Sequence, residues 1–412
     1  MRPLAEAQAD VLDSVPSLPV VSVPPGDAAG LALAEVVRAL HDVPPFSNSA
    51  MDGFAVRGDD LAVAPVELVV LEDVPAGSVP TRPVTAGTAI KIMTGAPLPT
   101  GADTVVKVED VEELGTGRVR VLAATAPGTS VRRAGGDMAA GALVFERGVR
   151  LGPAHLGVLA SLGVMPEVRR RPVVAVLSTG DEVVPPDTRT LEPGKIRDSN
   201  RPQLVGLLTE LGVVIRDLGI VPDDERLLRA TLQRAAREAD VVVTSGGVSM
   251  GEYDLVKQVL MQLGSVEFWR VAMQPAKPFA FGSVAGTPLF GLPGNPVSVF
   301  VAFEQFLRPA LLTMMGSAKV FRPRIRGTMD ENVATDPDKT VFVRVATEYE
   351  PDSGWAARRS GGQSSNVLSA LAGADALAVV PVGVGDVARG DDVVLEMFRW
   401  PEQRTREEVL GE

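Results

Sequence analysis

Between residues 171 and 318, short apolar runs alternate with amphipathic stretches of helical length. Each run has the composition of a buried strand and ends in a loop that contains glycine; the runs begin at residues 173, 241 and 289. The amphipathic stretches predict helices over residues 202–211, 224–238 and 254–263. Strands that alternate with helices at this spacing indicate a doubly wound α/β domain with a parallel sheet. Ligands of such sheets bind outside the carboxyl ends of the strands, so we expect the three loops to line one crevice.

The loop within residues 241–254, VVVTSGGVSMGEYD, has the composition of a phosphate and metal site. Its paired glycines carry no Cβ, so the backbone N–H groups of residues 245–247 can approach an anion closely. Two carboxylates follow, Glu252 and Asp254, and carboxylates can hold a hard cation against such an anion. An ordinary strand-to-helix turn explains the same residues equally well when this loop is considered alone.

The two other loops repeat this composition. Residues 173–182, VVAVLSTGDE, place Ser178, Thr179 and Gly180 after an apolar strand and end on two acids. Residues 289–298, LFGLPGNPVS, place a Pro-Gly-Asn-Pro turn before a segment with a helical pattern. Three loops of one kind favour a shared crevice over three independent turns.

The residue types that are missing narrow the chemistry. The 412-residue chain contains no cysteine and two histidines, His41 and His155. Disulfides, thiolate nucleophiles, cysteine-bound iron–sulfur clusters and poly-histidine metal sites are therefore excluded. A catalytic triad would need one of the two histidines, and neither lies in a segment of catalytic composition. Carboxylates, lysines, hydroxyls, backbone amides and Mg²⁺ remain, and they suit phosphoryl or nucleotidyl chemistry.

The net charge of the chain and its N-terminal residues indicate which partners it has and where in the cell it is located. A formal net charge of −12 argues against nucleic acid and anionic membranes as main partners. The first residues, MRPLAEAQADVLD, lack the apolar region of a signal peptide, and no run approaches the roughly 18 apolar residues of a membrane span. We therefore expect a cytoplasmic protein.

The length predicts about two to four domains. Helical patterns at residues 3–13, 27–40 and 153–163 flank a strand-rich stretch, so residues 1–45 and 141–170 are expected to form one N-terminal linker or dimerisation domain. A β-rich module at residues 46–140 would interrupt it. Residues 171–320 would be the α/β domain, and residues 321–412 a C-terminal β domain with strands such as TVFVRVATEY.

Polar clusters outside the strand-end loops are open to two interpretations. Residues 44–54, PPFSNSAMDGF, end near Asp52 and fit a domain-joining turn and a site wall equally well. Thr94 directly follows a strand, and Lys277 lies in QPAKPFAFG. The segments VRRAGGDM and ARRSGGQSSN place arginine pairs beside glycine turns, which suits phosphate binding, although adjacent surface arginines are more often solvated.

Taken together, these segments make the chain resemble the molybdopterin molybdenumtransferase family, which is related to the E domain of gephyrin. The similarity extends over nearly the whole chain. The segments that carry it are, in family order, SNSAMDGFAV, KIMTGAPLPTGADTVV, RRAGGDM, LSTGDE, RDSNRPQL, DVVVTSGGVSMGEYD, AKPFAFG and LFGLPGNPVS. So many long motifs in one order argue against coincidence.

The resemblance implies the final step of molybdenum cofactor assembly, in which adenylylated molybdopterin and molybdate give molybdenum-molybdopterin and AMP, assisted by Mg²⁺. It also implies an elongated homodimer with a site between the α/β domain of one subunit and the β module of the other, and it makes the molybdopterin adenylyltransferase a candidate partner. By motif, the catalytic residues would be Asp52, Thr94, Asp137, Glu182, Asp223, Asp254 and Lys277, with Glu182 and Asp254 as metal ligands. The substrate-binding residues would be Ser245, Gly246, Gly247, Ser249, Arg270, Gln274, Pro293, Asn295, Pro296, and Ser364 or Ser365.

The segment WRVAMQPAKP departs from the family pattern. Lysines are frequent where this chain has Arg270 and Gln274, and glycine is common where it has Ala276. Arginine keeps the positive charge and glutamine does not, so the departure concerns the contacts to the anion. Two alternatives stay open: a molybdopterin adenylyltransferase, which is typically a single small domain, and a non-catalytic molybdopterin-binding scaffold, against which the intact acids of GDE and GEYD argue.

Overall fold

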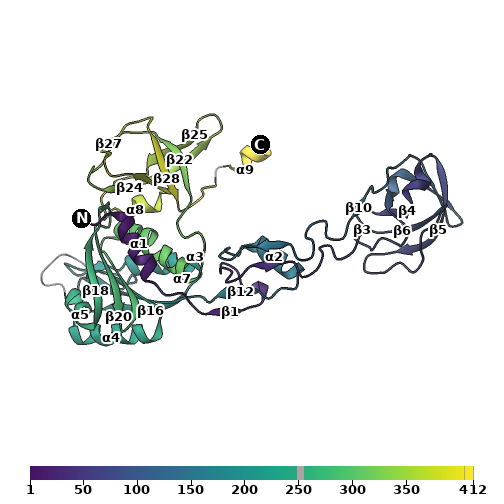
Figure 1. Cartoon of the computed structure of the whole chain (residues 1–412). Coiled ribbons are helices and arrows are strands. Elements are labelled where there is room, and N and C mark those ends of the chain that lie inside the picture. The colour runs from purple at the N-terminus through teal and green to yellow at the C-terminus, as the bar shows by residue number, and fades with distance from the viewer. Residues whose placement is uncertain (248–254, 403, 412) are drawn as a thin grey trace.

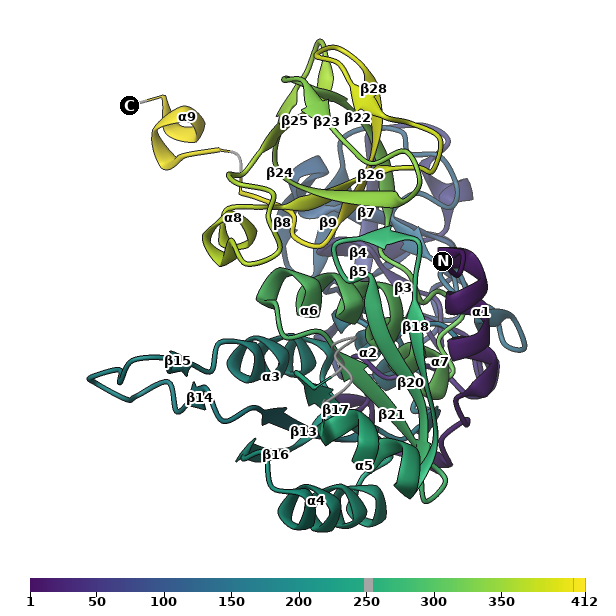
Figure 2. The same cartoon turned by 90° about the vertical axis from the view of Figure 1, so that its left-hand side faces the viewer.

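The computed structural model describes residues 1–247, 255–402 and 404–411. The chain is elongated, with an α/β unit and a C-terminal β unit at one end and a β-rich module at the other (Figure 1). Narrow ribbons of paired strands connect the two ends. Seen from the side, the C-terminal β unit stands on the α/β unit (Figure 2).

The α/β unit is built on a sheet with the strand order β16-β13-β17-β21-β20-β18. Runs such as VVAVLST in β13 form its centre because apolar, β-branched side chains pack well on both faces of a covered sheet. Its strands are β13 (Val173–Thr179), β16 (Val214–Val221), β17 (Val241–Ser245), β18 (Gly264–Arg270), β20 (Pro278–Val284) and β21 (Thr287–Leu292). The three strands expected from the sequence are β13, β17 and β21.

The sheet is parallel only in part, which corrects the expectation of a wholly parallel sheet. β13 pairs in parallel with β16 and with β17, and β17 pairs in parallel with β21. β20 and β18 are added antiparallel at the edge beyond β21. The chain between β20 and β21 is only Ala285-Gly286, whereas a parallel neighbour needs a crossover of about a dozen residues.

Helices cover both faces of this sheet, as a doubly wound fold requires. Val174 and Val176 of β13 join the core beneath α3 (Asn200–Leu211). Ala175 and Leu177, which point the opposite way, join the core beneath α4 (Glu225–Glu238) and α5 (Leu255–Leu263). The helices predicted at 202–211 and 224–238 are confirmed, and α5 matches the third over the residues that the structure describes.

A long helical segment packs on the α3 side. It consists of α6 (Pro296–Ala302), a π-helical turn η4 (Phe303–Leu307) and α7 (Arg308–Met314). By length and composition, Pro296–Met314 could cross a membrane, with a mean hydropathy of 1.3, but 94% of this stretch is buried inside the fold. A core helix that packs on a sheet has the same length and composition.

Helix α1 (Leu4–Ser14) also belongs to this side of the α/β unit. Ala7 and Val11 are completely buried in the core that contains α7. The side-chain amide of Gln8 donates to the backbone carbonyl of Gln305 over 3.2 Å and to its side-chain oxygen over 3.1 Å. Helix α1 therefore packs against the α/β unit, whereas we expected residues 1–45 to belong to the linker domain.

The β-rich module folds around a sheet with the order β7-β4-β6-β5-β9-β8. Phe54 and Leu68 lie in one of its apolar clusters, and Ile90 and Val105 in another. Its elements are β4 (Gly53–Val56), η2 (Gly58–Leu61), β5 (Val66–Val74), β6 (Thr88–Ile92), β7 (Thr104–Lys107), η3 (Val108–Asp110), β8 (Val111–Gly115) and β9 (Arg118–Val121). The pair β3 (Asn48–Ser49) and β10 (Val131–Arg132) forms its neck.

The linker consists of two antiparallel ribbons and two short helices. The ribbons are β1 (Val20–Ser22) with β12 (Glu167–Arg169), and β2 (Val37–Arg38) with β11 (Leu143–Phe145). They bring two segments together that the β-rich module separates in the sequence. The short helix η1 (Pro25–Asp27) and α2 (Pro153–Ser161), which matches the pattern at 153–163, complete the linker. The domain limits drawn from the sequence stay predictions.

The helix expected over residues 27–40 is wrong. Leu33 donates to the carbonyl of Val149 over 3.0 Å, and Leu151 donates to the carbonyl of Leu31 over 2.8 Å. These backbone bonds reach more than a hundred residues along the chain and replace the local bonds of a helix. Gly30, with a φ of +76°, turns the chain into this pairing.

The C-terminal unit is a closed β structure. β24 pairs with both β25 and β26, β28 pairs with both β26 and β22, and β22 pairs with β25. The strands therefore form a closed ring. Its elements are β22 (Arg324–Met329), β23 (Val333–Ala334), β24 (Thr340–Glu350), β25 (Gly354–Arg359), α8 (Leu368–Ala372), β26 (Ala376–Val380), β27 (Asp386–Val387), β28 (Asp392–Met397) and α9 (Arg406–Leu410). β19 (Met273–Gln274) of the α/β unit pairs in parallel with the start of β24 and joins the two units.

Candidate active site

The candidate site lies where β13, β17 and β21 end. In the register of the sheet, Ser178 of β13 is opposite Ser245 of β17, and Ser245 is opposite Leu292 of β21. The backbone N–H of Gly246 donates to the carbonyl of Leu292 over 3.1 Å, so the second and third loops touch. The three loops share one edge of the sheet, as the sequence predicted, because the carboxyl ends of parallel strands meet there.

Glycine is required at the second loop for space as well as for backbone conformation. Gly246 and Gly247 have φ values of +92° and +69°, in the region that side chains rarely adopt. A Cβ at Gly246 would lie 3.0 Å from the carbonyl oxygen of Thr179, and one at Gly247 would lie 2.2 Å from the side chain of Val256. The loop therefore packs tightly against the end of β13 and the start of α5. Ser249 and Asp254 lie outside the described residues.

Glu182 brings a carboxylate to the end of β13. A Cβ at Gly180, whose φ is +129°, would lie 2.6 Å from a carboxylate oxygen of Glu182, so this side chain folds back over the loop. The next loop is tied to it: Asp223 donates its N–H to the Asp181 carboxylate over 3.0 Å, and Asp181 donates its N–H to the Asp223 carboxylate over 3.4 Å. Two of the predicted catalytic acids, Glu182 and Asp223, thus belong to neighbouring loops.

The hydroxyls around these strand ends are buried and lack hydrogen-bond partners. Among the described residues, this holds for Ser178 Oγ, Thr179 Oγ1, Thr244 Oγ1 and Ser245 Oγ. Asn200 Oδ1, at the start of α3, is also buried and has no hydrogen-bond partner among the described residues. Since buried polar groups are nearly always paired in native proteins, such a cluster is typical of a ligand site.

The start of α6 forms the next wall of the site. Pro296 is the first residue of the helix and Asn295 its N-cap, and the side-chain amide of Asn200 donates to the carbonyl of Gly294 over 2.7 Å. Val297 donates its backbone N–H to the carbonyl of Ser365 over 3.1 Å. The turn that contains Pro293 is thereby joined to a loop of the C-terminal unit, which brings Ser364 and Ser365 to this edge.

Arg344, in the middle of β24, is a residue that the sequence analysis missed. It is completely buried, and its Nη2 donates to the carbonyls of Gly362 and Ser364 over 2.8 and 3.3 Å. Its Nε has no acceptor among the described residues. Burial lowers the pKa of Arg344 to about 10. In the sequence, Arg344 is the one charged residue of the apolar run TVFVRVA. That pattern could have indicated a buried arginine, but it fits an arginine on the solvent-facing side of a strand equally well.

The segment from Arg270 to Lys277 lies at the same edge because β18 and β20 run antiparallel. Arg270, the last residue of β18, is opposite Pro278, the first residue of β20, and Ala280 is opposite Gly291 near the end of β21. The backbone N–H of Val271 donates to the carbonyl of Lys277 over 2.9 Å. Arg270 and Lys277 are exposed cations at the end of the sheet where the acids lie.

Gln274 and Ala276 occupy the middle of this segment. Gln274 is exposed and pairs in register with Val341 of β24, three residues before Arg344. Ala276 is buried at a φ of +70°. Glycine adopts this conformation without strain, which explains why glycine is common here in the resembled family.

The remaining predicted residues lie at the other end of the molecule. Asp52 accepts hydrogen bonds from the backbone N–H and the hydroxyl of Thr94, over 2.7 and 2.8 Å. The backbone bond and then the hydroxyl bond lower the pKa of this exposed carboxyl. Asp137 follows the neck strand β10 in the chain, and its N–H donates to the carbonyl of Val43 over 3.0 Å. Within one chain the β-rich module is far from the α/β edge (Figure 1), so the structure divides the predicted residues into two groups.

Carboxylates are the potential metal ligands at this edge of the sheet. No group of three or more His, Cys, Asp or Glu side chains that could hold a metal ion occurs among the described residues. Mg²⁺ commonly uses one or two carboxylates, with waters and substrate phosphates as its other ligands. The exposed carboxylate of Glu182, close to the end of β13, fits that requirement.

Models of known families match this chain along most of its length. The MoeA N-terminal region (domain I and II) matches residues 2–163, a probable molybdopterin binding domain matches residues 175–313, and the MoeA C-terminal region (domain IV) matches residues 326–398. The unit that carries the three loops is thus the one that resembles the molybdopterin binding domain.

Known proteins resemble the chain over most of its length. Molybdopterin molybdenumtransferase 2 of Mycobacterium tuberculosis is 38% identical, over 95% of this chain and 98% of its own. Gephyrin of Dictyostelium discoideum is 31% identical, over 88% of this chain and 57% of its own. The crystal structure of the molybdopterin biosynthesis MoeA protein from Pyrococcus horikoshii has a TM-score of 0.82 at 30% identity and covers 97% of this chain and 100% of its own.

Proposed function

The chain belongs to the molybdopterin molybdenumtransferase family, and we propose that it inserts molybdate into adenylylated molybdopterin at the crevice formed by the ends of β13, β17 and β21. The products are molybdenum-molybdopterin and AMP. As a transferase of molybdenum cofactor biosynthesis, it acts on small anions, and the crevice supplies the donors that such anions need.

The cluster of buried, unpartnered hydroxyls at the ends of β13 and β17 is the observation that carries the proposal. A phosphate of the substrate would accept hydrogen bonds from these hydroxyls and from the backbone of residues 245–247. Such donors are held in place by the sheet, so they do not have to reorganise as charge develops on the leaving phosphate.

The cations around the crevice balance the charge of the substrates. Adenylylated molybdopterin and molybdate are both anionic, whereas the protein has a net charge of −12. Arg270 and Lys277 line the edge from one side, and the buried Arg344 lies beside the Ser364 loop on the other. We assign molybdate to the Arg344 side, because a desolvated guanidinium whose Nε has no acceptor among the described residues would bind a small oxyanion strongly.

Mg²⁺ is the proposed metal, held by Glu182 and Asp254 together with substrate phosphate oxygens. When bound, it would neutralise the charge of the phosphates between the pterin and the adenosine. The role of the chain's own residues is to position the phosphates beside the carboxylate of Glu182.

A homodimer is proposed because the residues of the β-rich module are too far from the crevice of their own chain (Figure 1). The linker exposes apolar side chains that would suit an interface between copies; they include Val20, Val36, Leu40, Leu143 and Met165. In the dimer, Asp52, Thr94 and Asp137 of one subunit would complete the site of the other. The molybdopterin adenylyltransferase, as the source of the substrate, is the proposed partner, and the cytoplasm the proposed location.

One assay tests the proposal against its alternatives. Purified protein is mixed with adenylylated molybdopterin, Mg²⁺ and molybdate, and AMP is followed with time. Molybdate-dependent AMP release supports insertion. Consumption of ATP with free molybdopterin would instead indicate an adenylyltransferase, and the absence of both reactions would indicate a scaffold.

A further inference from the structure

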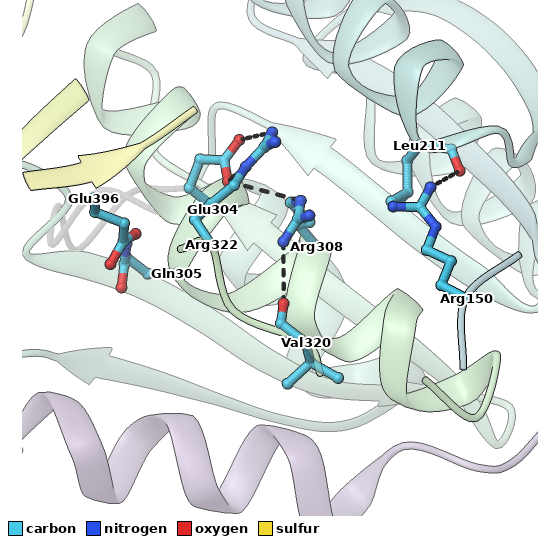
Figure 3. A network of polar contacts seen from close by, with 8 residues as sticks. All are labelled: Arg150, Leu211, Glu304, Gln305, Arg308, Val320, Arg322 and Glu396. Carbon is cyan, nitrogen blue, oxygen red and sulfur yellow. Dashed lines mark hydrogen bonds and ion pairs between the residues drawn. The ribbon is translucent and has the colours of Figure 1, made fainter. Parts of the chain in front are cut away.

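A cavity lined by arginines lies away from the candidate active site, where three parts of the chain meet. It has a volume of about 80 Å³, and Arg150, Arg308 and Arg322 contribute to its wall. Figure 3 shows Glu304 between Arg322 and Arg308, with Arg150 on the other side of Arg308. Leu211 and Phe303 complete the apolar part of the wall.

The three arginines come from three structural units. Arg150 leads from the linker ribbons into α2, Arg308 is the first residue of α7 after the π-helical turn, and Arg322 precedes β22 of the C-terminal unit. Whatever binds all three would hold the linker, the α/β unit and the C-terminal unit in one arrangement.

Each arginine has only some of its donors occupied. Arg150 donates from Nε to the carbonyl of Gly30 over 3.0 Å and from Nη2 to that of Leu211 over 3.3 Å. Arg308 donates from Nη1 to the carbonyl of Val320 over 3.0 Å. Arg322 uses Nε and Nη2, each 2.9 Å from an oxygen of Glu304. Arg150 Nη1, Arg308 Nη2 and Arg322 Nη1 have no hydrogen bond to any described residue.

The residues that line the cavity carry three positive charges and one negative charge, and the buried carboxylates of Glu304 and Glu396 lie behind this wall. Arg322 is the best compensated of the three arginines, because burial, which would lower its pKa, is outweighed by its hydrogen bonds to Glu304, which raise the pKa. The carboxylate of Glu304, whose side chain is 1% exposed, is hydrogen-bonded to Arg322 and lies 3.9 Å from Arg308. The one carboxylate among the residues that line the cavity, Glu210, is exposed. Burial, and then the charge of Arg322, lower the pKa of Arg308 to about 10, and the same two causes lower the pKa of Arg150. A buried group of cations with free donors is costly unless an anion accompanies it.

We propose that this cavity is a second anion site, which binds a tetrahedral oxyanion of the size of phosphate between Arg150, Arg308 and Arg322. Its volume admits more than one water molecule, and a five-atom oxyanion fits, but a nucleotide or a pterin does not. Guanidinium groups bind such oxyanions through paired N–H donors. The bound ion locks the junction of the three units and stabilises the native protein, independently of the molybdate insertion proposed above.

Thermal unfolding in inorganic phosphate, compared with chloride at equal ionic strength, tests this site. The parent protein should melt about 2 °C higher in phosphate, because an ion bound only by the native state raises the melting temperature. Arg150→Met should abolish most of this difference, since it removes one of the three guanidinium groups, including an Nη1 that has no hydrogen bond to any described residue. Lys277→Gln, a change in the crevice, should keep the difference. If the difference is absent from the parent, or is lost in Lys277→Gln and kept in Arg150→Met, the proposal is wrong.

A direct measurement covers the case in which Arg150→Met does not fold. Crystals of the parent protein soaked in selenate should show an anomalous selenium peak between the three guanidinium groups, since selenate has the shape and charge of sulfate. Density for water alone at that place, at a selenate concentration that stabilises the protein in solution, would overturn the proposal.

Discussion

Glu182 is the described carboxylate whose position bears most directly on catalysis. It is exposed and folds over Gly180 at the end of β13, so its charge contributes little to folding and, in the proposed function, acts on a bound phosphate or metal. We expect Glu182→Gln to slow AMP release at least about tenfold, equivalent to about 1.4 kcal/mol of barrier, with the melting temperature unchanged. Asp254→Asn should behave in the same way.

Glu192 provides the matched control for Glu182. It is an exposed glutamate in the loop between β14 (Val183–Val184) and β15 (Ile196–Arg197). Figure 2 shows that this loop extends away from the sheet. Glu192→Gln should retain parental turnover. Equal rates for Glu182→Gln and Glu192→Gln at saturating Mg²⁺ would contradict the role of Glu182.

Thr94 controls the protonation of Asp52. The backbone N–H and the hydroxyl of Thr94 both lower the pKa of this carboxyl. Asp52 therefore stays ionised further into the acid range than an ordinary aspartate, and the stabilising bonds to Thr94 are lost as the pH falls through its folded-state pKa. In Thr94→Val the hydroxyl bond is lost and the backbone bond remains, so we expect the pKa of Asp52 to rise part of the way to its ordinary value.

Titration of the Asp52 carboxyl by carbon NMR measures this shift. The acid limb of the pH–activity profile should move upward with it, if Asp52 acts as an anion. Thr100→Val, at an exposed threonine of the same loop segment, serves as the control and should leave both curves in place. An unchanged Asp52 titration in Thr94→Val would show that the hydroxyl bond does not form in solution.

At the scale of elements, β24 joins the C-terminal unit to the crevice. Its buried Arg344 holds the loop that contains Ser364, and this loop touches the start of α6. Arg344→Met keeps much of the side-chain volume but removes the charge. A charged hydrogen bond is worth about 1.5–3 kcal/mol, so molybdate binding to the substrate-loaded enzyme should weaken about tenfold or more.

Arg358 is the comparison for this change, since it is an exposed arginine on the neighbouring strand β25. Arg358→Met should leave molybdate affinity as it is in the parent. Calorimetric titration of molybdate measures both. If Arg344→Met and Arg358→Met bind molybdate equally well, the Arg344 side of the crevice is not the molybdate site.

At the scale of the whole molecule, the distance between the β-rich module and the crevice predicts a shared site. Asp52→Ala subunits and Glu182→Ala subunits should each be inactive alone. Mixed dimers should contain one intact site, and random mixing should therefore restore about a quarter of the parental activity. Differential tags verify that mixed dimers form; if they form and stay inactive, each chain completes its own site.

The local pattern of apolar residues was sufficient to predict those helices and strands whose buried positions recur regularly along the chain. The apolar runs of β13, β17 and β21 and the amphipathic pattern of α4 predicted their elements, because both faces of a strand and one face of a helix must be buried. The same reasoning failed over residues 27–40, where backbone bonds to residues near 150 replaced a helix. It also missed Arg344, because a single arginine in an apolar run does not reveal whether its side chain points inward.

The sequence by itself determined the α/β domain, the glycine loops at its strand ends and the restriction to oxygen and nitrogen chemistry, since each depends on residue type and local spacing. Only the tertiary structure decided which of these residues meet. It joined Ser365 to Val297, set Asp52 apart from Glu182 and gathered Arg150, Arg308 and Arg322 around one cavity. Contacts between residues so far apart in the chain depend on how whole units pack, and local spacing carries no information about that packing.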